Sequence, residues 1–84
     1  MKLAVEISLY PLNEDYVKYI KAFIDRLNED KALFVSTSHT STIVSGEYDH
    51  LIETMRIEMK KTFDELGQAI FVCKFLNANN MDLS

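Results

Sequence analysis

Residues 3–11 read LAVEISLYP, and this stretch decides the fold. Branched apolar residues stand at every second position, namely Leu3, Val5, Ile7 and Leu9. This two-residue period is typical of a β-strand that buries one face against a core. Pro11 offers no N–H to a neighbouring strand, and Asn13 with the two acidic residues after it favours the start of a helix. We therefore expect a central strand followed directly by a helix.

The opposite face of this strand carries polar and aromatic side chains. Glu6, Ser8 and Tyr10 place a carboxylate, a hydroxyl and an aromatic ring in one row, two residues apart. Successive side chains of a strand point to opposite faces, so all three should point away from the core. We expect any binding site to lie along this row.

Patterns further along the chain predict a second helix and three more strands. Apolar residues spaced by three and four predict helices over 13–29 and 47–66, the second of them capped by Gly67. Strands are predicted over 33–38, over 41–45 where Gly46 breaks the strand, and over 69–76. The hydroxyl-rich segment 36–42 (STSHTST) reads as the bend of a hairpin. The order βαββαβ predicts an α+β, ferredoxin-like sandwich, in which a four-stranded antiparallel sheet carries both helices on one face.

The last predicted strand indicates self-association. It reads AIFVCKFL, and apart from Lys74 the side chains on both of its faces are apolar. We therefore expect both faces of this strand to be covered. The helices cover one face of the sheet, and a bare apolar face favours a second copy packed sheet to sheet. We expect a homodimer or larger assembly through the open sheet face, with Phe71 and Phe75 in the contact.

Composition sets limits on the class of protein. The 84 residues are enough for one domain, assigned to residues 1–78, with a frayed tail over 79–84 that has no periodicity. A net charge of -4 argues against nucleic acid as a partner. No apolar run approaches the roughly 20 residues that span a bilayer, so we expect no membrane association and a cytoplasmic location. The lone Cys73 reads as a small buried hydrophobe.

Three short motifs occur in a fixed order, at 8–16 (SLYPLNEDY), 37–42 (TSHTST) and 46–50 (GEYDH). Together they resemble the YkoF-related family of thiamine- and hydroxymethylpyrimidine-binding domains, over nearly the whole chain. The resemblance implies a ferredoxin-like fold and a thiamine-like ligand. Because founding members of that family carry two repeats in one chain, it also implies that two copies of this single-repeat chain associate. The positions carried over are Ser8, Tyr10, Pro11, Ser41, Thr42, Gly46, Asp49 and His50.

Five residues are the predicted ligand contacts: Glu6, Ser8, Tyr10, Ser41 and Thr42. Glu6 beside Ser8 suits the edge of an aminopyrimidine, and the alternative is an ion pair with Lys74. Tyr10 could stack on a heterocycle or contact a thiazolium through its π-face, or instead pack in the core. Thr42 aims a hydroxyl at one face of the sheet, across from the Glu6 row, although threonine is also a good strand former.

We expect a binding protein for thiamine, hydroxymethylpyrimidine or a related heterocycle. The first alternative is an interaction module in which the sheet only assembles subunits, and the second is an enzyme of a thiamine-linked pathway. No GxSxG segment, glycine-rich phosphate loop or carboxylate paired by spacing with Glu6 occurs, so we predict neither catalysis nor a cofactor. His39 and His50 are predicted to be surface residues rather than metal ligands, because no spacing such as HxxxH accompanies them.

Overall fold

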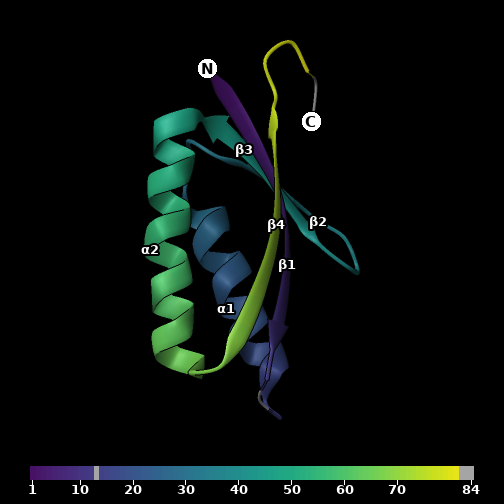
Figure 1. The fold of residues 1–84 in the computed structure, drawn as a ribbon, viewed down its shortest axis with the longest axis vertical. Helices are drawn as coiled ribbons and strands as arrows, with labels where there is room; N and C mark the ends of the chain where they lie inside the picture. The colour runs from purple at the N-terminus through teal and green to yellow at the C-terminus, as the bar shows by residue number, and fades with distance from the viewer. Residues whose placement is uncertain (13, 82–84) are drawn as a thin grey trace.

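The computed structural model describes residues 1–12 and 14–81. The described elements, in chain order, are β1 (Lys2–Pro11), α1 (Tyr16–Glu29), β2 (Phe34–Thr37), β3 (Thr42–Glu47), α2 (Tyr48–Leu66) and β4 (Ala69–Asn77). The strands pair antiparallel in the order β2-β3-β1-β4, so β1 is central. Both helices pack on one face of this sheet (Figure 1). The predicted ferredoxin-like βαββαβ sandwich is confirmed.

The core lies between the sheet and the helices. The buried residues of β1 are Leu3, Val5 and Ile7, together with the small Ala4. The first three pack against Phe23 and Leu27 of α1 and Leu51 and Met55 of α2. An aromatic cluster extends the core toward β4, with ring centroids 5.4 Å apart for Phe23 and Phe71 and 5.3 Å apart for Phe63 and Phe71. Every second residue of the opening stretch therefore lies in the core, as its alternating sequence predicts.

Gly46 plays a different part from the one predicted. It lies within β3, which continues to Glu47, rather than ending the strand. A Cβ atom at position 46 would stand 2.6 Å from Leu33 Cδ2 and 3.3 Å from the Ala32 carbonyl oxygen. Glycine in a strand interior often marks such a close approach of another segment. Helix α2 then follows without a loop, and the Glu47 side chain caps it by accepting a hydrogen bond from the His50 N–H at 3.0 Å.

Helix α1 begins at Tyr16, with Asp15 as its N-cap. The predicted start at Asn13 lies outside the described residues. At the far end of the chain, the Ala78 N–H donates to the Lys2 carbonyl at 2.9 Å, and the Lys2 N–H donates to Asn79 Oδ1 at 2.7 Å. These bonds hold the segment after β4 against the start of β1, while residues 82–84 of the predicted tail are not described.

The prediction that Phe71 and Phe75 lie on the open face of the sheet is wrong. Both residues stand at positions of β4 that face the helices, opposite Leu9 and Val5 of β1. Phe71 packs against two aromatic rings of the core, whereas Phe75 is 49% exposed because β4 is an edge strand. The side chains of β4 on the open face are Ile70, Val72, Lys74 and Leu76.

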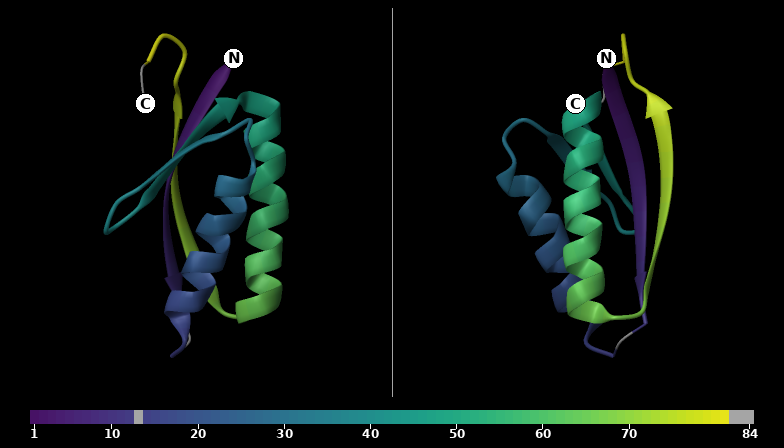
Figure 2. Two further views of the ribbon diagram at one scale, coloured as in Figure 1. Left: turned by 180° about the vertical axis from the view of Figure 1, so that it is seen from behind. Right: turned by 60° about the vertical axis from the view of Figure 1, so that its left-hand side comes forward.

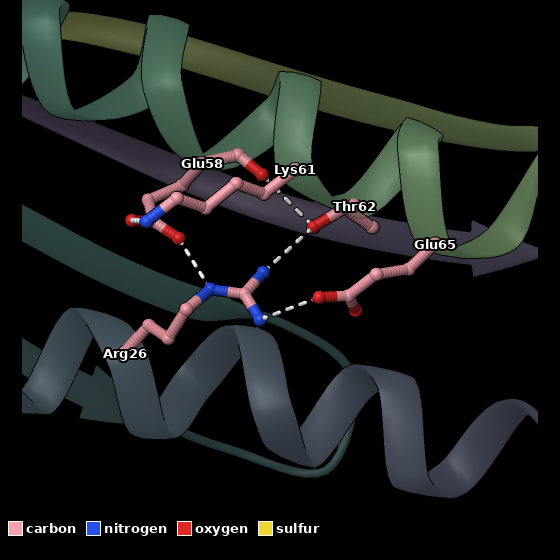
Figure 3. Close-up of polar contacts among 5 residues, drawn as sticks. All are labelled: Arg26, Glu58, Lys61, Thr62 and Glu65. Carbon is pink, nitrogen blue, oxygen red and sulfur yellow. Dashed lines mark hydrogen bonds and ion pairs between the residues drawn. The ribbon is translucent and has the colours of Figure 1, made fainter.

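A polar network joins the two helices (Figure 3). The Arg26 guanidinium donates to Glu58 Oε2 at 2.5 Å, to Thr62 Oγ1 at 3.2 Å and to Glu65 Oε1 at 3.4 Å. Lys61 lies 3.5 Å from the other oxygen of Glu58. Glu58 is nearly buried, so its contact with Arg26 is shielded from solvent between α1 and α2.

Within residues 1–12 and 14–81, neither helix has the length and apolar character of a membrane-spanning segment.

Candidate ligand-binding site

The five predicted contact residues divide between the two faces of the sheet. Residues directly opposite one another in antiparallel strands point to the same face. Thr42 lies opposite Ile7, whose side chain is in the core, so Thr42 points toward the helices and is 5% exposed. Glu6 lies opposite Ile43 and Lys74 on the open face. The prediction that a ligand could contact Thr42 and the Glu6 row from one face is therefore wrong.

A small hollow lies between α1 and the β2–β3 hairpin, with a volume of about 110 Å³. One wall is apolar and consists of Leu9 from β1 with Ile20 and Ile24 from α1. The other wall is the hairpin, which contributes Thr37, Ser38, His39, Thr40, Ser41 and Thr42. An apolar wall facing several hydroxyls suits a flat ring with polar groups on its edge.

Ser38 organises the hairpin wall. Its N–H donates to the Ser41 carbonyl at 2.9 Å, and its Oγ donates to the same oxygen at 3.2 Å. The same Oγ accepts hydrogen bonds from the backbone N–H groups of Thr40 and Ser41 at 3.4 and 3.3 Å. These bonds are typical of a serine turn. The bend is thus held by its own side chain, which positions Ser41 and Thr42 at the hollow.

Thr42 reaches the hollow from the first position of β3. Its Oγ1 lies 3.3 Å from Thr37 Oγ1 across the hairpin, and Thr37 is exposed to solvent. A β-branched side chain on a strand has few rotamers, so this pair of hydroxyls has a defined direction. The pair can both donate and accept, as a ring nitrogen and an amino group require.

The residues of the opposite row are not among those that line the hollow. Glu6 forms an ion pair with Lys74 at 3.7 Å, which is the alternative the sequence left open. Ser8 Oγ donates to the Thr40 carbonyl at 3.3 Å and so ties β1 to the hairpin from the open face. Tyr10 is 54% exposed, so its alternative role in the core is wrong. The structure brings Ser41 and Thr42 together and separates them from Glu6, Ser8 and Tyr10.

Titratable groups near the site are few. Over residues 1–12 and 14–81, no three His, Cys, Asp or Glu side chains gather where they could hold a metal ion. His39 and His50 are exposed, as predicted. His39 lines the hollow, whereas His50 Nε2 lies 2.7 Å from Asp30 Oδ2 and links the start of α2 to the end of α1. Burial raises the pKa of the Cys73 thiol, so this side chain stays protonated at neutral pH.

Several lining residues were missed because their signals were assigned to other roles. Ile20 and Ile24 belong to the apolar stripe of α1, and sequence periodicity alone makes every such residue a core residue. The STSHTST segment was interpreted as a bend in which only Ser41 and Thr42 contact a ligand, so its other lining residues were missed. Its density of hydroxyls exceeds what a short bend requires, and that excess was the available signal for a polar wall.

Comparisons with known proteins agree with this architecture. A family model described as the YKOF-related family matches residues 2–80. A candidate thiamine biosynthesis/salvage protein from Thermotoga maritima superimposes with a TM-score of 0.84 at 15% identity, covering 99% of this chain and 91% of that chain. A Streptococcus pneumoniae protein gives 0.83 at 18% identity, over 92% of this chain and 87% of that one. A Methanocaldococcus jannascii protein gives 0.80 at 19% identity, over 99% and 87%. At these identities the structural matches show the fold alone. No curated protein matches the chain.

Proposed function

This chain belongs to the YkoF-related family, and from that premise we propose that it binds hydroxymethylpyrimidine, thiamine or a related heterocycle in the hollow between α1 and the β2–β3 hairpin. The observation that carries the proposal is the pairing of an apolar wall with a hairpin rich in hydroxyls. The name of the similar Thermotoga maritima protein, which refers to thiamine biosynthesis or salvage, supports the same ligand class.

The size and charge of the hollow favour one part of such a ligand. At about 110 Å³ it is smaller than the roughly 300–1,000 Å³ of pockets that enclose drug-sized molecules, so it suits one ring rather than two. Its described lining residues include no carboxylate that would pair with a cationic thiazolium. The pyrimidine ring therefore enters, with its edge on the Thr37 and Thr42 hydroxyls, and any second ring remains outside the hairpin. On this proposal the protein acts by binding and not by catalysis.

Titration calorimetry with hydroxymethylpyrimidine and with thiamine tests this function. A ligand at 100 times its Kd should add about 2.7 kcal/mol to the free energy of unfolding, which a thermal-shift measurement detects independently. We expect both compounds to bind. If neither releases or absorbs heat and neither raises the melting temperature, the chain is not a thiamine-type binding protein.

Thr42→Val should weaken hydroxymethylpyrimidine binding about three- to tenfold while the fold survives. The substitution keeps the β-branched shape and removes the hydroxyl, and one lost hydrogen bond is worth about 0.5–1.5 kcal/mol. Thr37, its neighbour at 3.3 Å, is exposed and can bond to water instead. Calorimetric Kd values and a circular-dichroism melt check both parts.

The matched control is Glu6→Gln on the open face, which we expect to leave the Kd unchanged. Glu6 is engaged by Lys74 and does not line the hollow. If Glu6→Gln weakens binding and Thr42→Val does not, the ligand lies on the open face and the proposed site is wrong.

We also propose that the open sheet face mediates self-association. The face exposes Phe34 of β2 with Ile70, Val72 and Leu76 of β4, and Ile43 of β3 lies between them. Apolar patches of this kind on a small domain mark interaction surfaces. A second copy would cover them by packing sheet to sheet.

Ile43→Asp should convert this assembly to smaller species. The residue sits near the centre of the open face, where a buried unpaired carboxylate costs several kcal/mol in an interface. Sedimentation velocity at micromolar concentration should show a lower mass than for the parent. Ile57→Asp on the exposed side of α2 is the control and should leave the mass unchanged. An unchanged mass for Ile43→Asp would exclude the open face as the contact.

A further inference from the structure

The two edges of the sheet are unlike one another. The β2 edge has four residues, Phe34–Thr37, and leads into the hairpin. The β4 edge has nine residues, Ala69–Asn77, which lie along the outside of the molecule in the right-hand view of Figure 2. Proteins usually protect a long edge strand with proline, a bulge or outward charges. β4 contains no proline or glycine, and its single charge, Lys74, points to the open face and pairs with Glu6.

Two hydrogen bonds just beyond the ends of β4 show which of its residues direct their backbone N–H and C=O groups toward β1 and which toward the free edge. The Ala78 N–H donates to the Lys2 carbonyl, and the Leu12 N–H donates to the Gln68 carbonyl, so even-numbered positions there bond to β1. In an antiparallel ladder, alternate residues direct their N–H and C=O groups to the opposite side. The residues that present these groups to the free edge are Ala69, Phe71, Cys73, Phe75 and Asn77. Within residues 1–12 and 14–81, no strand pairs with this side of β4.

We propose that this free edge pairs antiparallel with β4 of a second copy of the chain, in a register centred on Cys73, so that the two sheets become one. Cys73 is the middle residue of the strand and presents its backbone to the edge. A two-fold axis through it places outward-facing residues opposite one another over all nine positions.

The side chains of β4 are self-complementary about that axis. Phe71 comes opposite Phe75 of the second copy, and Ile70 comes opposite Leu76 of the second copy. The half-exposed Phe75 is thereby covered, and aromatic pairs across strands are stabilising. Lys74 comes opposite Val72 of the second copy rather than opposite another lysine, so no like charges oppose each other. A strand of unrelated sequence would have no reason to match this symmetry, which is why the occupant is a second copy.

Cross-linking through the native Cys73 tests the register. Opposite residues in a hydrogen-bonded antiparallel pair lie about 5.5 Å apart at Cα, within the roughly 4.4–6.8 Å that a disulfide spans. Oxidation should be carried out at alkaline pH, because burial raises the pKa of this thiol. We expect a covalent dimer on a non-reducing gel.

The matched control moves the cysteine to a more accessible position of the same strand. In Cys73→Ser/Phe75→Cys the thiol is at a 49% exposed position that is not on the open face, and the register places it opposite Phe71 of the second copy and far from its own counterpart. Random collision would cross-link this variant more readily than the parent, whereas edge pairing cross-links the parent only. Cross-linking of the control in preference to the parent overturns the proposal.

Cys73→Pro tests the edge without relying on a disulfide. It removes an N–H that β1 does not use, a site where a strand tolerates proline, and Cys73→Val retains that N–H. The proline variant should sediment at a lower mass with the circular-dichroism spectrum of the parent, while the valine variant should keep the parent's mass. An unchanged mass for a folded Cys73→Pro overturns the proposal, and if that variant does not fold, the cross-linking pair decides. Cross-linking through Cys73 should persist in Ile43→Asp, because that substitution disrupts only the open-face contact. The proposed edge pairing and the proposed open-face contact can therefore be disproved independently.

Discussion

Arg26→Met should lower the free energy of unfolding by about 2–3 kcal/mol, a large share of the roughly 5–15 kcal/mol that stabilises a small domain. The Arg26 and Glu58 side chains are only 20% and 11% exposed, and their 2.5 Å contact joins α1 to α2. Removing one partner of a buried pair leaves the other charge uncompensated, which costs about 3–5 kcal/mol. Lys61 at 3.5 Å compensates part of the Glu58 charge, so we expect a loss at or just below the lower end of that range.

Urea unfolding of three variants separates this effect from ordinary surface electrostatics. Lys21→Met breaks an exposed ion pair of α1, that of Lys21 with Asp25 at 2.7 Å, and should change stability by less than about 0.5 kcal/mol. Arg26→Met/Glu58→Met replaces both buried charges by apolar groups and should recover most of the lost stability. If Arg26→Met is as stable as Lys21→Met, the network in Figure 3 does not hold the helices together.

Phe71→Asp should strongly destabilise the fold of the monomer, whereas Val72→Asp next to it should leave the stability of the monomer nearly unchanged. Phe71 packs edge-on against Phe23 and Phe63, so its replacement by a carboxylate removes core contacts and places a charge among aromatic rings. Loss of a core phenylalanine alone costs about 3–5 kcal/mol, and the partial exposure of Phe71 places the whole effect at about 3 kcal/mol or more.

Val72 lies one residue further on and points to the open face opposite Ser8. Val72→Asp should change the unfolding free energy by less than about 1 kcal/mol and lower the mass of any assembly formed through that face. Circular-dichroism melts and sedimentation of the two variants are the measurements. A folded Phe71→Asp together with an unfolded Val72→Asp would mean that the two faces of β4 are assigned the wrong way round.

The open-face prediction for Phe71 and Phe75 failed for a reason that applies to any doubly apolar strand. An alternating pattern shows which face a residue is on only when the residues of one face are polar. In AIFVCKFL the odd-numbered and the even-numbered residues are both largely apolar. Pairing with β1 was needed to show that odd-numbered residues of β4 face the helices. Gly46 was misread for a related reason, since a strand glycine is explained by the approach of Leu33, thirteen positions earlier in the chain.

Local patterns were enough to determine the strand and helix order of this chain, and with it the ferredoxin-like fold, because a period of two or of 3.6 is a property of consecutive residues. They also identified the hairpin that carries Ser41 and Thr42. The face on which Thr42 lies depended on register, since a slip of one residue between β1 and β3 turns a side chain to the opposite face. The hollow itself required Ile20 and Ile24 of α1 to come against the hairpin. Such contacts between segments far apart in sequence exist only once the chain has packed.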